Sequence, residues 1–320
     1  MLSHSVPSAG PVDKEDWVCD LQLLHHFCTV TTDTLAIRED ARYTWRVMVP
    51  REGYENTYLM HGILAISALQ QAQLYPAQKE HFLALSSSHQ AEGLETFRTL
   101  LQNVKPENWP SMFCYASLVV YYTSALPVRL GVTDLPDPIS NVVELFTVIK
   151  GIDAVLAPFI PSLRKSFLAP LAYSVWLEDP VLGNRRPPVS LLPEDTLEQI
   201  NLVREFSETL DMATEEHNDY SIALSRLESA VRQINLAGPS VEAGMAYIWP
   251  FGLPKSVTTA IQEKRPLALI VLAQFCVLLH LLNNYWFLRG WGKQLLVEIG
   301  KQLSSTYAHW LEWPNRHVFG

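Results

Sequence analysis

The sequence predicts an all-α protein, folded as one compact domain of many helices. Most of the chain consists of segments in which apolar residues recur with helical spacing, and almost no segment alternates with the period of a strand. Short stretches bearing Pro, Asn, Asp and Gly separate these segments. Hydrophobic residues make up 48% of the 320 residues and charged residues 18%, against the ~25% charged residues of an ordinary domain. A large buried interior is therefore expected.

The helical domain is predicted to span residues 17–320, after a flexible arm at residues 1–16 that is rich in Ser, Pro and Gly. Residues 178–193 carry several prolines and a glycine, which is typical of a loop and predicts a hinge there. No internal repeat is visible.

The first helix is predicted over residues 20–37, with Asp20 as its cap. Four residues are predicted on its inward face: Leu21, Leu24, His25 and Cys28. Asn56 or Thr57 is predicted to cap the second helix. Its apolar residues fall at i, i+4, i+7 and i+10: Leu59, Ile63, Ile66 and Leu69.

Pro76 suits the opening turn of a third helix that ends near Asn103. The residues predicted to point inward from it are Phe82, Leu85, Leu94, Phe97 and Leu101. Residues 107–126 are apolar on nearly every side, which predicts a helix at the centre of the bundle, and Pro127 is expected to end it.

Helices are predicted over residues 139–156, 194–214 and 217–236, followed by a stretch through residues 249–254 that Pro and Gly interrupt. Residues 267–282 form the most apolar run of the chain. This run is shorter than the ~20 residues that span a bilayer. A buried core helix is expected here, and no membrane span.

Charge and cysteine usage exclude several classes of protein. Lys and Arg number 24 against 33 Asp and Glu, a formal net charge of -9, whereas nucleic-acid binding rests on clustered basic residues. We therefore expect no direct nucleic-acid contact. The four cysteines form no C-x-x-C pair, so neither a metal site nor a disulfide framework is predicted. The N-terminus resembles no secretory signal, which predicts a cytoplasmic or nuclear protein.

No cofactor is predicted, because the sequence has none of the glycine-rich nucleotide motifs, no H-E-x-x-H and no G-x-S-x-G. The adjacent His25 and His26 point about 100° apart on a helix and cannot share one metal ion; one is expected to pack and the other to face solvent. His61 and His280 each allow two interpretations. Each is a buried imidazole satisfied by a backbone carbonyl, or a hydrogen-bond donor or general acid/base in a pocket.

Aromatic residues in apolar helices allow the same two interpretations, as core residues or as the walls of a ligand site. The candidate ligand-binding residues are Tyr58, Tyr115, Trp249, Phe275, Trp286 and Arg289. Arg289 is expected either to anchor a hydroxyl or carboxylate at a pocket mouth, or to pair with Glu298 or Glu312. If the chain is an enzyme, the candidate acid/base residues are His25, His61, Tyr121, Tyr122 and His280.

An ordered set of blocks along the chain resembles the regulatory domain of fungal zinc-cluster transcription factors, in particular the sterol-uptake-control subgroup. The blocks lie at residues 21–27, 45–50, 58–69, 97–113, 145–151, 266–273, 278–292 and 310–314. They cover about residues 19–314, and their order carries the resemblance, because no single block is a chemical motif.

The resemblance implies an all-helical domain with a deep apolar pocket that senses a sterol or another small lipid. It also implies self-association through helices, so a homodimer stays open, although no heptad seam is visible. The sequence departs from the family in one major respect. No cluster of six cysteines and no basic linker precedes the first block, so we expect no zinc-cluster DNA-binding module. Gln70 and Gln274 stand where family members often place His.

Two functions follow, and the residues leave both open. The first is a stand-alone helical domain that binds an apolar small molecule, such as a sterol, terpenoid or polyketide, without binding DNA. The second is a cofactor-independent cyclase or isomerase of a fungal secondary-metabolite pathway that uses the same scaffold, since an apolar pocket can fold a substrate and position a few polar groups. A purely structural interaction module ranks third.

Overall fold

A computed structural model of the protein describes residues 16–131, 135–173, 175 and 190–320. Within these residues every regular element is a helix, which confirms the predicted all-α class. Residues 1–15 of the predicted arm and residues 178–189 of the predicted hinge lie outside the described residues.

The N-terminal part of the chain folds into α-helices joined by short π-helical turns. The α-helices are α1 (Asp16–His26), α2 (Thr32–Leu35), α3 (Glu39–Tyr43), α4 (Val49–Glu55), α5 (Thr57–Leu74) and α6 (Lys79–Leu100). The π-helical turns are η1 (Phe27–Thr31) and η2 (Thr44–Met48), and a 3-10 turn, η3 (Pro76–Gln78), joins α5 to α6.

Long helices and short connecting helices alternate in the middle of the chain. They are α7 (Trp109–Ser124), α8 (Leu126–Leu130), α9 (Pro138–Leu156), η4 (Ala157–Phe159), α10 (Ile160–Leu163) and α11 (Ala169–Ala172). The C-terminal part contains α12 (Thr196–Thr209), α13 (Thr214–Ala237), η6 (Gly238–Ser240), α14 (Ala243–Phe251), α15 (Lys255–Gln262), α16 (Pro266–Leu281), α17 (Trp291–Gln302), η7 (Ser305–Leu311) and α18 (Glu312–Phe319).

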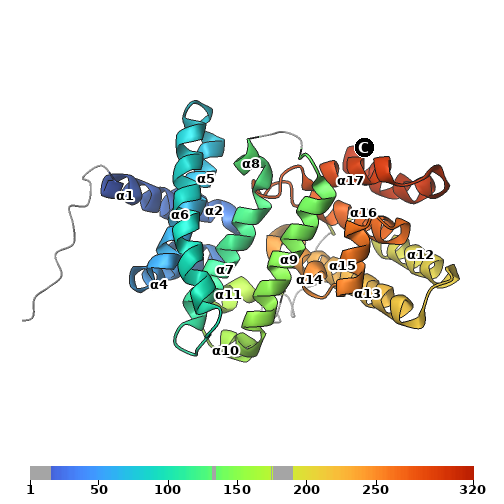
Figure 1. Ribbon diagram of the computed structural model, residues 1–320, viewed down its shortest axis with the longest axis horizontal. Helices are drawn as coiled ribbons and strands as arrows, with labels where there is room; N and C mark the ends of the chain where they lie inside the picture. The colour runs from blue at the N-terminus through green and yellow to red at the C-terminus, as the bar shows by residue number, and fades with distance from the viewer. Residues whose placement is uncertain (1–15, 132–134, 174, 176–189) are drawn as a thin grey trace, which may run out of the picture.

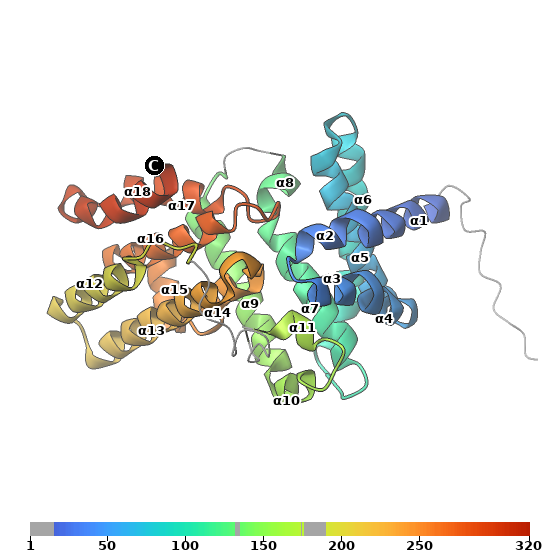
Figure 2. The ribbon, with the colours of Figure 1, turned by 180° about the vertical axis from the view of Figure 1, so that it is seen from behind.

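The two groups of helices lie at opposite ends of an elongated molecule. Figure 1 shows α1 to α6 at one end and α12 to α18 at the other, with α7 and α9 between them. The view from behind in Figure 2 shows the same order, and it also shows α14 close to the middle of the molecule, near α11 and α7. One continuous hydrophobic core runs from Phe27 through α7 to Val318 and joins the two ends into a single domain.

Three helices are buried on most sides, and for two of them, at residues 107–126 and 267–282, the nearly continuous apolar sequence predicts this. They are α5, α7 and α16, and every residue of α16 from Leu267 to Leu279 is buried. The predicted central helix is therefore confirmed, although it begins at Trp109 and Pro127 lies in the first turn of the next helix, α8.

The predicted inward face of the first helix is wrong for two of its four residues, whereas Leu24 and Cys28 pack against the core. Leu21 and His25 are exposed, whereas Leu23 and Phe27 are fully buried. Apolar residues occur on two faces of this short helix. Which face is buried therefore depends on how the helix packs against α5. Asp20 does not cap the helix, because α1 begins at Asp16 and Asp20 lies inside it.

Two further boundaries differ from the prediction. The stretch through residues 249–254 contains the end of helix α14, with Pro250 inside its last turn, and ends just before α15. Pro250 has no N–H for the carbonyl oxygen four residues back, so the buried packing of its side chain has to hold this turn. Asn56 stands at the start of α5, but its side chain donates to the Glu52 carbonyl oxygen at 2.9 Å and does not cap the helix.

Glycine allows α5, α6 and α7 to approach closely around one tyrosine. A Cβ atom on Gly93 would lie 2.7 Å from the Tyr115 hydroxyl oxygen and 2.9 Å from the Tyr58 carbonyl oxygen. A Cβ atom on Gly62 would lie 2.8 Å from the Tyr115 ring. These contacts are shorter than van der Waals contact, so both positions require glycine.

We expect Gly93→Ala to lower the free energy of unfolding by about 1–3 kcal/mol, the usual cost of overpacking. The matched control is Gly151→Ala in α9, where an added Cβ atom has no neighbour within 4 Å. Alanine there is expected to raise stability by about 0.5–1 kcal/mol, because it favours a helix over glycine. Urea denaturation followed by circular dichroism measures both. Equal effects of the two substitutions would contradict the close approach.

Candidate functional site

The residues predicted to form a site lie in several separate places. Tyr58 and Tyr115 lie between α5, α6 and α7, whereas Trp249 and Phe275 belong to α14 and α16. The three predicted histidines lie on α1, α5 and α16. The predicted set therefore does not form one constellation.

Tyr58 and Tyr115 are core residues with satisfied hydroxyl groups. The Tyr58 hydroxyl donates to Ser111 Oγ at 2.8 Å, and the Tyr115 hydroxyl donates to the Gln90 carbonyl oxygen at 3.5 Å. Their rings meet edge to face, with centroids 5.5 Å apart. Burial raises the pKa of Tyr58 to about 12. Neither residue lines the cavity described below.

Trp249 and Phe275 form an aromatic cluster with Phe146 in the C-terminal half of the core. The ring centroids of Trp249 and Phe275 lie 4.5 Å apart, and the Phe146 ring meets Trp249 edge to face at 5.5 Å. Trp249 Nε1 donates to the Ala223 carbonyl oxygen at 3.0 Å. The contacts place both residues within the packed core.

A small cavity of about 60 Å³ lies where η2, α7, α9, α11 and α14 meet. It is mainly apolar, and its walls come from both ends of the chain. The lining residues are Trp45, Phe113, Ser117, Val120, Tyr121, Ile152, Leu171, Val175, Gly244, Tyr247 and Phe251. Of the eleven residues predicted as site residues, Tyr121 alone lines this cavity.

Two tyrosines, Tyr121 and Tyr247, line the cavity. Tyr247 Oη lies 2.9 Å from Ser124 Oγ. The Tyr121 ring packs on Trp45 at 5.7 Å and on Phe287 at 4.7 Å between centroids, but its hydroxyl has no hydrogen-bond partner among the described residues. Burial raises the pKa values of Tyr121 and Tyr247 well above the ordinary value of a tyrosine. Both hydroxyls therefore stay protonated at neutral pH, and that of Tyr121 is free to donate to a bound group.

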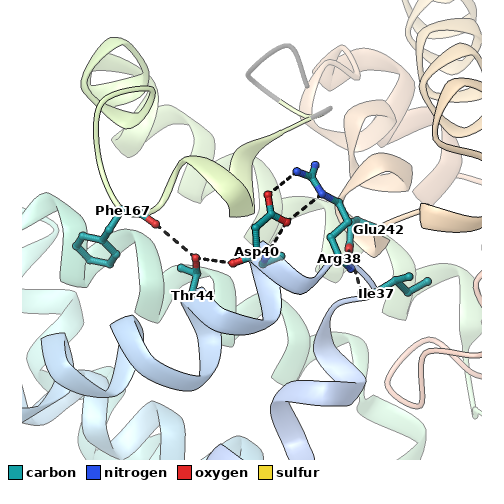
Figure 3. A network of polar contacts seen from close by, with 7 residues as sticks. Ile37, Arg38, Asp40, Thr44, Phe167 and Glu242 are labelled. Atoms are coloured by element: carbon teal, nitrogen blue, oxygen red, sulfur yellow. Dashed lines mark hydrogen bonds and ion pairs between the residues drawn. The ribbon is translucent and has the colours of Figure 1, made fainter. Parts of the chain in front are cut away.

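A polar network connects Glu242, the residue immediately before α14, to the turn between α2 and α3 (Figure 3). Glu242 Oε1 accepts hydrogen bonds from the backbone N–H groups of Ile37 at 2.9 Å and Arg38 at 2.7 Å. The Arg38 guanidinium pairs with Asp40 at 2.7 Å. The Thr44 hydroxyl lies 2.9 Å from the Asp40 carbonyl oxygen and 3.5 Å from that of Phe167. The network thus links the N-terminal helices to the start of α14 beside the cavity.

Burial raises the pKa of Glu242, and the N–H donors of Arg38 and Ile37 oppose this shift. The Tyr285 hydroxyl lies 3.0 Å from the Val241 carbonyl oxygen and 3.1 Å from Glu242 Oε2. The Tyr285 hydroxyl has one proton to donate, so these two acceptor oxygens share it. Glu242 was not among the predicted site residues, although an acid isolated within an apolar segment is a visible signal in the sequence.

The histidines have three different environments. His25 is exposed and His26 Nε2 lies 3.1 Å from Gln70 Oε1, which confirms that one of the two packs and the other faces solvent. His280 is partly exposed at the end of α16, where its Nδ1 lies 2.9 Å from Asn283 Nδ2. Burial and the nearby Lys293 lower the pKa of His280.

His61 is not a buried imidazole bonded to a backbone carbonyl. Its side chain is 29% exposed, and its Nδ1 lies 3.1 Å from His89 Nδ1. Its Nε2 lies 3.4 Å from Glu92 Oε2. Burial lowers the pKa of His89, against the opposing effect of Asp20. This pair, with its two acids, lies away from the cavity.

Trp286 and Arg289 line an open groove of about 430 Å³ between α5, α8 and α17, together with Lys79 and Gln294. Trp286 Nε1 donates to Thr34 Oγ1 at 3.1 Å. Glu298 pairs with Lys301, and neither Glu298 nor Glu312 forms an ion pair with Arg289 in the described chain. Arg289 thus lines an open groove.

Tyr122 is buried, and the Arg129 guanidinium lies over its ring at 4.4 Å.

Among the residues with described positions, no group of three or more His, Cys, Asp or Glu is arranged to hold a metal ion. None of the described helices is by itself long and apolar enough to cross a membrane. Helices α15 and α16 meet that test only as a pair, and they are bent by 97°.

The chain is similar to fungal transcription factors, although no family model matches it. It is 25% identical over 328 aligned residues to a Zn(2)-C6 fungal-type transcription factor of Gibberella zeae, an alignment that covers 97% of this chain and 63% of that protein. It is 24% identical over 102 residues to sterol uptake control protein 2 of Saccharomyces cerevisiae, covering 32% of this chain and 11% of that protein. The chain thus spans less than two thirds of the length of these relatives.

Proposed function

We propose that this chain is a helical ligand-binding domain of the regulatory type, which takes up an apolar small molecule at the cavity between α7 and α14. The observation that carries the proposal is Tyr121, whose hydroxyl has no hydrogen-bond partner among the described residues, in a mainly apolar cavity wall. Ligand sites combine apolar walls with a few oriented polar groups in this way. The similarity to a sterol uptake control protein supports the class of ligand.

The size of the cavity limits how such a ligand binds. A volume of about 60 Å³ equals the share of about two water molecules in the liquid. One apolar group with a hydrogen-bond acceptor fits this space, whereas a whole sterol enters only when lining side chains move. We therefore propose that the acceptor of the ligand meets Tyr121 and that its remaining apolar body displaces side chains of the wall.

We also propose that the chain does not contact nucleic acid itself. The formal net charge of -9 supports this, because a phosphate-binding surface requires clustered Lys and Arg. The second candidate, a cyclase or isomerase, gains less support from the geometry. Of the five proposed acid/base residues only Tyr121 lines the cavity, and its raised pKa makes it a poor proton acceptor at neutral pH.

Binding of the fluorescent sterol dehydroergosterol tests the proposal, through energy transfer from tryptophans such as Trp45. Tyr121→Phe is expected to weaken binding by up to about tenfold, the loss of one hydrogen bond. Gly244→Val places a side chain at the cavity wall and is expected to abolish binding. A Cβ atom added at Gly244 would lie 3.0 Å from Val175 Cγ2, so even the first carbon of the new side chain is crowded.

The matched control is Gly151→Val on the exposed face of α9, where an added Cβ atom has no neighbour. This variant is expected to bind the sterol like the wild-type protein. Saturable binding that both Tyr121→Phe and Gly244→Val leave unchanged would place the ligand elsewhere in the molecule.

A further inference from the structure

Two histidines from neighbouring helices face each other at the surface of the α1–α5–α6 group. His61 Nδ1 on α5 lies 3.1 Å from His89 Nδ1 on α6, with ring centroids 5.3 Å apart. The side chain of His61 is 29% exposed and that of His89 is 11% exposed. Solvent therefore reaches the space beside the two nitrogen atoms.

The second nitrogen of each ring faces a carboxylate. His61 Nε2 lies 3.4 Å from Glu92 Oε2, and His89 Nε2 lies 3.3 Å from Asp20 Oδ1 on α1. A carboxylate beside Nε2 favours the ring proton on that nitrogen. A neutral imidazole has one ring proton, so in this tautomer both Nδ1 atoms carry lone pairs that face each other. Facing lone pairs repel, so a positive group must lie between the two nitrogen atoms, either a proton carried by one ring or a cation.

We propose that His61 and His89 bind a divalent cation of the zinc class through their Nδ1 atoms, with Asp20 and Glu92 as the residues that position the two rings. Two nitrogen ligands at 2.0–2.1 Å in tetrahedral coordination are about 3.3 Å apart, close to the observed 3.1 Å. Imidazole suits zinc, and a ligating histidine normally donates its other ring N–H to a carboxylate. Water completes the coordination on the exposed side.

Two features make the four residues suitable for this role. Asp20 and Glu92 supply two negative charges that offset the charge of the cation, although neither contacts Nδ1. The rings are held by the α5–α6 pair, which packs along much of its length, so little ordering is required when the cation binds. None of the four residues lines the cavity between α7 and α14, so this site is independent of the proposed ligand site.

Competition of the 320-residue chain with a chromophoric zinc chelator tests the proposal. The titration uses a Cys19→Ser, Cys28→Ser background, because both thiols are partly exposed and a thiolate is itself a zinc ligand. One zinc ion per chain is expected. His61→Asn and His89→Asn are each expected to abolish this binding, and Asp20→Asn to weaken it by about 10- to 100-fold, as for other carboxylates behind a ligating histidine.

His25→Asn is the matched control, since His25 is exposed on α1 and lies outside the pair. It is expected to leave zinc affinity unchanged, and circular dichroism checks that every variant is folded. Nitrogen-15 spectra of the histidine rings add a direct readout, in which zinc shifts the Nδ1 signals of His61 and His89. Zinc affinity that does not depend on His61 and His89, or Nδ1 signals that show a shared proton at saturating zinc, would overturn the proposal.

Discussion

Replacing Trp249 by alanine is expected to lower the free energy of unfolding by about 3–5 kcal/mol, the range for removing a large aromatic side chain from a core. Trp249 is fully buried and packs on Phe275 and Phe146, which belong to α16 and α9. Its indole N–H also bonds to α13 through the Ala223 carbonyl oxygen. The substitution thus leaves a cavity where four helices meet. Urea denaturation monitored by circular dichroism measures the loss.

Trp17→Ala is the matched control, because Trp17 is 50% exposed on α1. Its effect is expected to stay within about 0.5 kcal/mol, as for surface substitutions in general. Trp249→Phe keeps most of the ring volume and is expected to cost less than Trp249→Ala. If Trp249→Ala were as mild as Trp17→Ala, Trp249 would not be the centre of the C-terminal core.

Glu242→Ala is expected to lower the free energy of unfolding by about 3 kcal/mol, because each polar group that loses its partner costs about 1–3 kcal/mol. The two backbone N–H groups of Ile37 and Arg38 lose their acceptor together. These contacts connect residues about 200 positions apart and join the N-terminal helices to α14. Urea denaturation measures the loss, and Glu39→Ala serves as the control, since Glu39 is exposed.

Glu242→Gln is expected to be mild and to change how stability depends on pH. Its amide oxygen still accepts from the Ile37 and Arg38 N–H groups, and its amide N–H donates to the Tyr285 hydroxyl, which keeps its bond to the Val241 carbonyl oxygen. Burial raises the pKa of Glu242 above 4.5 in the folded protein. The stability that the protonated Glu242 carboxyl contributes is therefore complete below pH 4.5, and it is lost as the pH rises through the folded-state pKa.

The stability of the wild-type protein relative to Glu242→Gln should accordingly decrease as the pH rises from 4.5. Urea denaturation of both proteins over a series of pH values measures the difference. A difference that increases with pH would mean that the N–H donors outweigh burial and that Glu242 is ionised in the folded protein.

Much of the fold can be predicted because helices require local periodicity. The nearly continuous apolar sequences of α7 and α16 predict buried helices, and both are buried. The prediction fails where two apolar stripes compete, as in α1, where Leu23 packs in place of Leu21. It also fails near Pro250, because neighbouring helices hold a turn that local sequence disfavours.

The sites are less predictable, because their residues come from distant parts of the chain. His61 was a candidate, but nothing in its local sequence indicates His89, 28 residues away. Tyr121 was a candidate too, yet the other cavity walls lie in η2, α9 and α14. The isolated acid Glu242 stands out in its apolar segment, but its partners could not be predicted, since Ile37 and Arg38 contribute backbone groups that every sequence has.

By itself, the sequence determined the all-α class, the order of the long helices and which of them are buried, because hydrophobic periodicity and burial are local consequences of residue type. Only the tertiary structure decided which face of α1 packs, which tyrosine reaches a cavity, and which histidine and carboxylate find partners. The reason is physical: hydrogen bonds and cavities act over about 3–4 Å, and at that range neighbours are set by how helices pack.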